Sequence, residues 1–443
     1  MLGVTAMFST YEEAISWVES RLMLGIKPGL MRMEWMMERL GHPERKLKAV
    51  HVGGTNGKGS TLTYLRSILE QAGYVTGTFT SPYIEQFNER ISVNGQPISD
   101  AEILELVNVI YPLATELDDT EDGGATEFEI ITAMVLYYFA EVHPVDIAII
   151  EVGLGGRFDS TNILQPLLSI ITNIGLDHVK ILGSTHKEIA FEKAGIIKQG
   201  TSLISAVSQE EAQAVILQEA EKKEAAVYLL NDQFTIIDHH SLASGERFTW
   251  QYEDKMIRDI SISMYGKHQT ENASLAIMAI QLLQKEHSLK ITEQHLRDGL
   301  KNAHWPGRFE IVSKQPVVIL DGAHNEEGIA VLTTELKKRY HDRNLKIIFS
   351  ALGDKSLDKM VAKLDDIAGK ITFVTFEHPR ATTAENLYNL SSSKNKHKQE
   401  DWQQALTEEF QTQKENDILV ITGSLYFIKQ VKELLKTMLI RQC

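Results

Sequence analysis

Residues 48–71, KAVHVGGTNGKGSTLTYLRSILEQ, decide the fold. The segment opens with an apolar run at 48–52, continues through the glycine-rich turn 53–60, and then repeats apolar residues at helical spacing. Strand, glycine turn and helix in this order predict a phosphate-binding loop. Glycines let backbone N–H groups converge on phosphate oxygens, and the helix N-terminus adds the positive end of its dipole.

The residue types in this loop predict a site for ATP, built from Asn56, Gly57, Lys58, Gly59 and Ser60. The Lys58 ammonium can neutralise the β- and γ-phosphates, and the Ser60 hydroxyl can bind Mg²⁺. The usual motif ends Gly-Lys-Ser/Thr, whereas this one ends Gly-Lys-Gly-Ser. A glycine-rich turn that merely contains a lysine is therefore the alternative.

Short β-branched runs alternate with amphipathic stretches along the chain, a pattern typical of parallel strands joined by helices. We predict an α/β protein with a P-loop-type, mostly parallel N-terminal ATPase domain (1–303) and a smaller Rossmann-like α/β domain (304–443). Pro and Gly at 304–307 place the boundary. The further strands expected are 75–80, 145–152, 168–172, 202–206, 226–230, 317–320, 346–350, 371–376 and 417–422.

Two other segments have distinct patterns. Alternating polar and apolar residues in 234–263 predict antiparallel hairpins. The charged stretch 393–400, SKNKHKQE, is expected to be a solvated loop.

Composition narrows the class of protein. The chain has 443 residues, 43% hydrophobic and 24% charged, which indicates ordinary globular domains. Its 45 basic and 60 acidic residues leave a charge of −15, which disfavours nucleic acid and membrane surfaces as partners. The single cysteine, Cys443, and the absence of a signal-like start or a long apolar run predict a cytoplasmic protein.

Seven short segments, read together, carry a family resemblance. They are TSPY (80–83), FNERI (87–91), EVGLGGR (151–157), DHVKILG (177–183), EKAGIIK (192–198), WPGR (305–308) and LDGAHN (320–325). With the phosphate loop, this ordered set resembles the folylpolyglutamate synthase/dihydrofolate synthase family, relatives of the Mur ligases. The resemblance implies a monomeric ATP-dependent ligase that activates the carboxylate of a reduced folate as an acyl phosphate and joins it to L-glutamate.

The same resemblance implies metal sites and a modified lysine. Ser81 and Glu151 would join Ser60 in binding Mg²⁺, and His178 would bind a second Mg²⁺. Glu151 ends an apolar run, where a bound metal would offset the cost of burying a carboxylate; for His178 a structural hydrogen-bonding role is the alternative. Lys193 matches a carbamylated catalytic lysine of the family, although its charged surroundings alone would indicate a solvated side chain.

Further ligand-binding residues follow from the resemblance. Asn272, Arg308 and Asp321 would bind ATP across an interdomain cleft, and His324 would act near the phosphates as a catalytic residue. An ion pair between Arg308 and Asp321 is the structural alternative, and Asn325 has the character of a helix N-cap.

Folate would be bound by three segments. These comprise Lys27, Pro28, Gly29 and Leu30; Thr126, Glu127, Phe128 and Glu129; and Phe158, Asp159 and Ser160. Phe128 and Phe158 could stack on a pterin, or could be core aromatics. Arg90 has no assigned partner.

Three alternatives to a folylpolyglutamate synthase stay open. The enzyme could also ligate glutamate to dihydropteroate, although relatives with that activity often show Leu-Asp-Ala where this chain has Phe158-Asp159-Ser160. A Mur-type peptide ligase is disfavoured, because only 52 residues precede Gly53 and a UDP-binding domain needs about 100. A P-loop regulatory protein without ligase activity would not need Lys193 or the second-domain residues.

Overall fold

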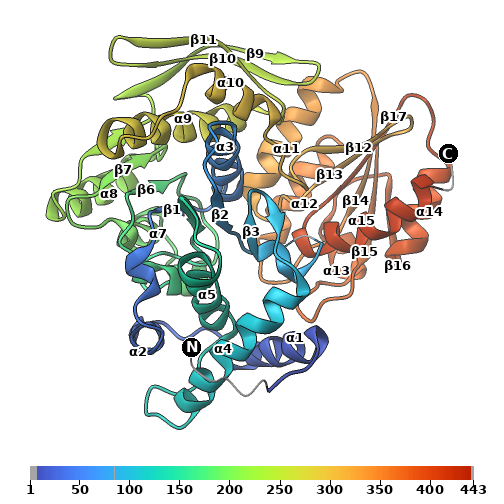
Figure 1. Cartoon of the computed structure of the whole chain (residues 1–443). Helices are drawn as coiled ribbons and strands as arrows, with labels where there is room; N and C mark the ends of the chain where they lie inside the picture. The colour runs from blue at the N-terminus through green and yellow to red at the C-terminus, as the bar shows by residue number, and fades with distance from the viewer. Residues whose placement is uncertain (1–6, 84, 441–443) are drawn as a thin grey trace. The chain divides into compact units, whose positions relative to one another are not determined.

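The computed structural model describes residues 7–83 and 85–440, so Cys443 lies outside the described residues. The chain forms two compact units (Figure 1). Unit 1 comprises Met1–His240, Arg247–Ser263 and Gln269–Ala303, and unit 2 comprises Ser241–Glu246, Met264–His268 and His304–Cys443. Two short segments ahead of residue 304 thus belong to unit 2.

An eight-stranded sheet forms the centre of unit 1. Its strand order is β4-β3-β2-β5-β1-β6-β7-β8, and every neighbouring pair is parallel except β2–β3 and β3–β4. The strands are β1 (Ala49–Gly53), β2 (Thr76–Phe79), β3 (Ile91–Val93), β4 (Gln96–Pro97), β5 (Ile147–Glu151), β6 (Leu168–Ile171), β7 (Ser202–Ser205) and β8 (Val227–Leu229). The predicted parallel strands are confirmed, whereas the short hairpin β3–β4 was not predicted.

Helices surround this sheet and join its strands. They are α1 (Tyr11–Ser20), α2 (Met31–Arg39), α3 (Lys58–Gln71), α4 (Asp100–Asp118), α5 (Glu127–Tyr137), α6 (Val179–Leu182), α7 (His186–Lys193), α8 (Glu210–Lys222), α9 (Lys267–His287) and α10 (Glu293–Asn302). One large core joins α1, α2, α4 and α5 to alternate residues of the central strands, such as Ala148 and Ile150 of β5. This alternation leaves the other face of the strands for α3, which contacts β1, β2 and β5.

The helix after the glycine turn is fixed by a close helix contact. A Cβ added at Gly299 of α10 would lie 2.5 Å from the Ile68 Cα of α3, so only glycine allows this approach. The Ser67 hydroxyl also donates to the Gly299 carbonyl oxygen at 2.7 Å. These contacts anchor the C-terminal half of α3, the helix whose first residue, Lys58, belongs to the phosphate loop.

A separate three-stranded sheet follows β8. It has the order β11-β10-β9 and contains β9 (Phe234–Leu242), β10 (Gly245–Tyr252) and β11 (Lys255–Ile262). Two-residue connections join its consecutive strands, which makes them hairpins, as the alternating pattern predicts.

Unit 2 is built around a six-stranded sheet of order β12-β13-β17-β14-β15-β16. Its pairs are parallel except β12–β13. The strands are β12 (Glu310–Lys314), β13 (Val317–Asp321), β14 (Asn344–Phe349), β15 (Lys370–Thr375), β16 (Lys396–Asp401) and β17 (Asp417–Thr422), and the helices are α11 (Glu326–Arg339), α12 (Leu357–Asp365), α13 (Ala384–Leu390), α14 (Trp402–Gln411) and α15 (Leu425–Ile440). Separate apolar clusters take alternate residues of β13, with Ile319 in one and Val318 and Leu320 in the other. Helices on both faces of a mostly parallel sheet confirm the predicted α/β class.

The prediction of a loop at residues 393–400 is wrong in its second part. Residues 396–400 belong to β16, which pairs in parallel with β15 at the edge of the sheet. Its side chains are charged and mostly exposed, as is common in edge strands that must not pair with other chains. Polar composition therefore concealed a strand.

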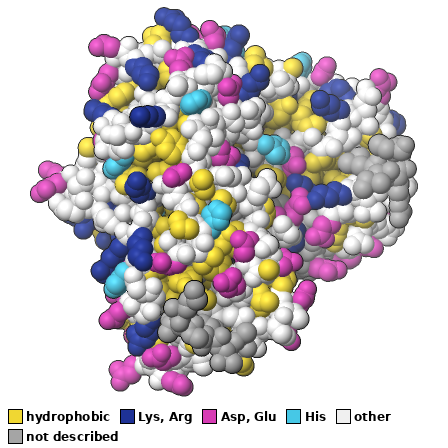
Figure 2. Space-filling view, in the orientation of Figure 1, with side chains coloured by type: hydrophobic (Ala, Val, Ile, Leu, Met, Phe, Trp, Pro, Cys, Tyr) yellow, Lys and Arg dark blue, Asp and Glu magenta, His cyan; other side chains and the backbone are white. Residues whose placement is uncertain are grey.

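Charges of both signs are interspersed on the face shown in Figure 2, with apolar side chains between them. Among the described helices, none has the length and apolar character needed to cross a membrane.

Candidate active site

The phosphate loop adopts a conformation that two of its glycines make possible. Gly54 and Gly57 have φ values of +139° and +86°, a region that other residues rarely adopt. An added Cβ would lie 1.9 Å from the Thr172 Oγ1 at Gly54 and 2.4 Å from the Asn272 Oδ1 at Gly57. The loop is thus packed closely against Thr172, which directly follows β6, and against α9.

The segment after β6 fastens the loop. The backbone N–H groups of Thr55 and Asn56 donate to the carbonyl and side-chain oxygens of Asn173, at 3.0 and 2.8 Å. The Thr172 hydroxyl donates to the Asn56 carbonyl oxygen at 2.6 Å. These hydrogen bonds of Thr172 and Asn173 with the loop were not predicted. Their only signal in the sequence is that the two polar residues directly follow a buried strand.

Lys58 begins α3 and its amine turns back over the loop. The Nζ lies 3.3 Å from the carbonyl oxygens of Gly54 and Thr55 and 3.8 Å from the Glu151 Oε1. Glu151 ends β5 and is 5% exposed. The structure thus brings Lys58, predicted to neutralise the phosphates of ATP, close to Glu151, predicted to bind Mg²⁺.

Ser81 lies beside Glu151 because β2 and β5 are parallel neighbours. The Ser81 backbone N–H donates to the Glu151 Oε2 at 3.4 Å. Arg90, which sequence reasoning left unassigned, donates to the Ser81 Oγ at 3.5 Å and to the Glu127 Oε1 at 2.9 Å. Arg90 is buried, so it ties a predicted metal ligand to the predicted folate segment.

Ser60 is buried in the first turn of α3 and is contacted by α9. The Gln269 Nε2 donates to the Ser60 Oγ at 3.3 Å, and the Asn272 Nδ2 donates to the Gln269 Oε1 at 3.2 Å. Asn272, predicted to bind ATP, therefore lies at the phosphate loop.

Lys193 is buried, contrary to what its charged sequence surroundings indicate. It is 5% exposed, and its Nζ donates to the Gly54 carbonyl oxygen at 2.9 Å. Burial, reinforced by the nearby charge of Lys58, lowers the pKa of Lys193 to about 7, although Asp177 and Asp159 oppose the shift. Close to neutral pH, the amine is therefore partly uncharged and nucleophilic.

His178 is exposed and precedes α6, and its backbone N–H donates to the Asp177 Oδ1 at 2.8 Å. Within residues 7–83 and 85–440, no three His, Cys, Asp or Glu side chains cluster closely enough to form a metal site by themselves. The metal-binding roles of Ser60, Ser81, Glu151 and His178 stay predictions.

Most predicted folate residues also hold local structure. Thr126 caps α5 in a capping box with Glu129, and Glu129 forms a 2.9 Å ion pair with Arg32. Phe128 stacks on Phe79 with ring centroids 5.5 Å apart. These contacts fix the start of α5 in the core.

The other two folate segments differ in exposure. The Lys27 Nζ donates to the Gly124 carbonyl oxygen at 3.0 Å, and Gly29 has a φ of +121°. Phe158 is 52% exposed, whereas Asp159 and Ser160 are buried. Stacking of a pterin between Phe128 and Phe158 stays a prediction.

In unit 2, one turn after β13 gathers the predicted residues. The Asp321 carboxylate accepts from the backbone N–H groups of Phe309 and Ala323, both at 2.8 Å. Burial raises the pKa of Asp321, and the charge of Arg308 opposes this shift. The His324 Nδ1 donates to the Gly322 carbonyl oxygen at 2.9 Å. Asn325 caps α11 by accepting from the Gly328 N–H, which confirms the predicted N-cap.

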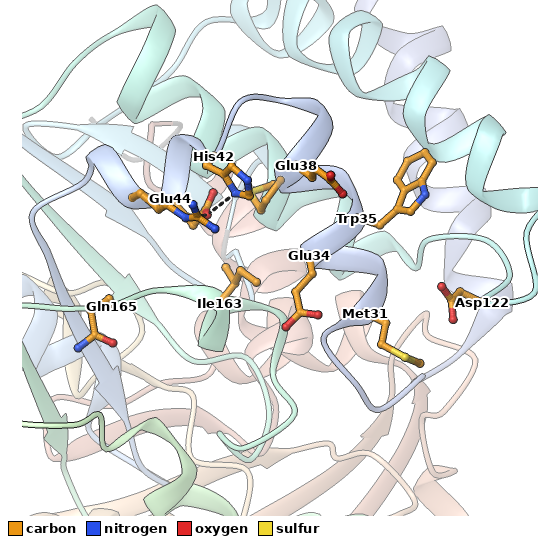
Figure 3. Close-up of a pocket in the computed structure, with 11 residues that line it drawn as sticks. Met31, Glu34, Trp35, Glu38, His42, Glu44, Asp122, Ile163 and Gln165 are labelled. Atoms are coloured by element: carbon orange, nitrogen blue, oxygen red, sulfur yellow. Dashed lines mark hydrogen bonds and ion pairs between the residues drawn. The ribbon is translucent and has the colours of Figure 1, made fainter.

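A pocket of about 830 Å³ in unit 1 involves residues that sequence reasoning did not select (Figure 3). It is lined by Met31, Glu34, Trp35, Met37, Glu38, His42, Glu44, Arg45, Asp122, Ile163 and Gln165. Four of these side chains are carboxylates, and Arg45 is the only Lys or Arg among them. Such a lining repels polyanions, so the pocket is unsuited to a glutamate tail.

Comparisons with known proteins agree with this geometry. The Mur ligase middle domain matches residues 52–280, and the Mur ligase glutamate ligase domain matches residues 307–425. The dihydrofolate synthase/folylpolyglutamate synthase of Bacillus subtilis (strain 168) is 50% identical over 430 residues, 97% of this chain and 100% of the relative. The folylpolyglutamate synthase of Lacticaseibacillus casei is 34% identical and covers 96% of this chain and 98% of the relative.

Solved structures extend the similarity to three dimensions. The folylpolyglutamate synthase of Thermotoga maritima superposes with a TM-score of 0.84 at 34% identity, covering 96% of this chain and 97% of that one. The Mycobacterium tuberculosis folylpolyglutamate synthase, complexed with ADP and AMPPCP, gives a TM-score of 0.88 at 29% identity, covering 96% and 98%. On sequence and fold together, the chain belongs to the folylpolyglutamate synthase/dihydrofolate synthase family of the Mur ligases.

Proposed function

We propose that this chain adds L-glutamate to the glutamate tail of a tetrahydrofolate, using ATP to activate the carboxylate. Membership in the family makes it an ATP-dependent, amide-forming ligase. The observation that carries the proposal is the convergence of the Lys58 and Lys193 amines and the Glu151 carboxylate on the phosphate loop. Phosphoryl transfer depends mainly on positioned charges of this kind.

The reaction has two steps. A carboxylate oxygen of the folate attacks the γ-phosphorus, the bond from that phosphorus to ADP breaks, and an acyl phosphate forms. The amino nitrogen of L-glutamate then attacks the acyl carbon, inorganic phosphate leaves with the electrons of the C–O bond, and the nitrogen loses a proton. Activation is necessary because a free carboxylate is a poor electrophile.

We assign the phosphate-binding roles as follows. Lys58 and the loop N–H groups that do not donate to Asn173 hold the phosphates, and Asn272, whose side chain lies beside Gly57, also binds ATP. Arg308 and Asp321 bind ATP, with Asp321 orienting the arginine, and His324 acts near the transferred phosphate. The grouping of these three residues around one turn of unit 2 supports a common role.

Mg²⁺ would be held at Ser60, Ser81, Glu151 and His178, in two sites. Ser60, Ser81 and Glu151 fit, because Glu151 offers a buried carboxylate and both serines offer hydroxyls, the hard oxygen ligands that Mg²⁺ prefers. When bound, Mg²⁺ neutralises phosphate charge.

We further assign a carbamate to Lys193. The neutral amine adds to the carbon of CO₂ and loses one proton, so a cation is replaced by an anion with two oxygens. A buried amine with a pKa of about 7 supports this reaction, because only the uncharged form is nucleophilic.

A second activity, ligation of glutamate to dihydropteroate, is supported by the printed name of the 50% identical Bacillus subtilis relative. The Phe158-Asp159-Ser160 segment is the sequence feature that argues against it. The predicted monomeric state and cytoplasmic location stay predictions.

The test is a substrate-omission assay with the purified chain. ATP, Mg²⁺, tetrahydrofolate and L-glutamate together should release ADP and phosphate and yield a folate extended by one glutamate, whereas omission of folate or glutamate should stop product formation. ATP hydrolysis that ignores both substrates would refute the proposal. Replacing the folate with dihydropteroate tests the second activity, and no ligated product would exclude it.

A further inference from the structure

A chain of buried hydrogen bonds links β1 to the 3₁₀ turn Ser160–Ile163, which follows the loop 153–160 after β5, and the proposed chemistry does not use it. Asp159 caps the 3₁₀ turn Ser160–Ile163, and its Oδ1 accepts from both the backbone N–H, at 3.0 Å, and the hydroxyl of Thr161. Its Oδ2 accepts from the Leu154 N–H at 2.8 Å. One carboxylate thus closes the loop 153–160 at both ends.

The chain continues into the centre of the sheet. His51, in the middle of β1, is fully buried, and its Nε2 lies 2.8 Å from the Thr161 Oγ1. Since the Thr161 hydroxyl donates to Asp159, it must accept from the Nε2–H of His51. Burial, aided by the charge of Lys198, lowers the pKa of His51 to about 3, so the imidazole is neutral and can keep this single arrangement.

This histidine is a costly choice for a central strand. Its neighbours in β1, Val50 and Val52, are fully buried apolar residues, and its Nδ1 is buried without a hydrogen-bond partner in the described chain. An unsatisfied buried polar atom costs about 1–3 kcal/mol, so an apolar side chain would stabilise this core better. The benefit of the imidazole is its directed bond to Thr161.

We propose that His51 and Thr161 are positioning residues that hold Asp159, and with it the loop 153–160, in the conformation that receives the folate. This inference rests on the proposed function and on the predicted folate segment Phe158, Asp159 and Ser160. It assigns substrate positioning to two fully buried residues that lie beneath the loop and to which the proposed function gives no role.

The test compares Thr161→Val, which keeps the shape and removes the hydroxyl, with Thr161→Ser, which keeps the hydroxyl. We expect Thr161→Val to raise the KM for folate about tenfold, because the side-chain hydrogen bond that holds Asp159 is lost. The KM for ATP and kcat should change less than about twofold, and Thr161→Ser should restore the folate KM. A general loss of stability would instead lower the amount of active enzyme, measured by melting and by kcat.

A double-mutant cycle with His51→Leu adds a second readout. If the three residues form one chain, the double variant His51→Leu/Thr161→Val should raise the folate KM no more than Thr161→Val alone. Additive effects, equal effects on both KM values, or an unchanged folate KM in Thr161→Val would overturn the inference. The wild type is the reference: if it forms no glutamylated folate, the proposed function fails, whereas an active wild type with an insensitive Thr161→Val variant defeats only this inference.

Discussion

The ε-amino groups of Lys58 and Lys193 donate to one carbonyl oxygen, that of Gly54, at 3.3 and 2.9 Å. Two cations that share one neutral acceptor repel each other, and burial of Lys193 adds to the cost. Burial first, and then the charge of Lys58, lower the pKa of Lys193 to about 7, which favours its uncharged form. The pair therefore places a fixed cation beside an amine that can react.

Replacing Lys58 should abolish phosphoryl transfer. Lys58→Ala removes the cation at the phosphate loop, and a loss of about 10²-fold or more in kcat is expected, as for other electrostatic transition-state contacts. Single-turnover ADP formation measures the effect. Ser67→Ala in the same helix, facing α10, is a control for helix stability. A Lys58→Ala enzyme with near-normal turnover would contradict the role.

The buried amine of Lys193 predicts a pH dependence of stability. Its pKa falls from 10.5 to about 7 on folding, so between these values the unfolded chain binds a proton that the folded chain lacks. The free energy of unfolding should therefore rise with pH in this window, by at most about 1.4 kcal/mol per unit, and this contribution is lost as pH falls towards 7.

Denaturant titrations of wild type and Lys193→Met in CO₂-depleted buffer measure this difference. Subtracting the two curves removes groups common to both proteins, such as Lys198. A difference that stays flat from pH 7 to 10 would show that Lys193 is not held uncharged.

Alanine variants of two glycines at opposite ends of α3 distinguish the effect of backbone strain from the effect of a steric clash. Gly57 and Gly73 have φ values of +86° and +85°, but only at Gly57 would a Cβ meet another group, the Asn272 Oδ1 at 2.4 Å. Gly57→Ala should raise the KM for ATP at least about tenfold, because the loop must shift. Gly73→Ala should cost about 1 kcal/mol of stability and leave the KM for ATP unchanged. Equal KM values in the two variants would refute the steric account of the loop.

Glu151 should control the requirement for Mg²⁺. Glu151→Gln keeps the shape but removes the charge, so the Mg²⁺ concentration for half-maximal activity should rise about tenfold or more. Titration of activity with Mg²⁺ after chelator treatment measures this shift. An unchanged Mg²⁺ requirement in the variant would remove Glu151 from the metal site.

Local patterns predicted the parts of the site that are local. The phosphate loop, the ends of β2, β5 and β13 and the cap at Asn325 were all found from short segments. Contacts between distant segments were missed, such as the Arg32–Glu129 pair and the hydrogen bonds between Asn173 and the phosphate loop, because one sequence contains no pairing information. Lys193 shows the limit most clearly: HKEIAFEK has the composition of a solvated helix, and only packing against Gly54 makes its amine buried.

Transfer of one oxygen atom from the folate carboxylate to inorganic phosphate tests the acyl-phosphate intermediate most directly. Tetrahydrofolate carrying ¹⁸O in its terminal glutamate carboxylates is incubated with the chain, ATP, Mg²⁺ and L-glutamate, and the released phosphate is analysed by mass spectrometry. The account predicts one ¹⁸O atom in the phosphate for each glutamate added, because the attacked carboxylate gives up one oxygen. Glutamylated product accompanied by unlabelled phosphate would contradict it.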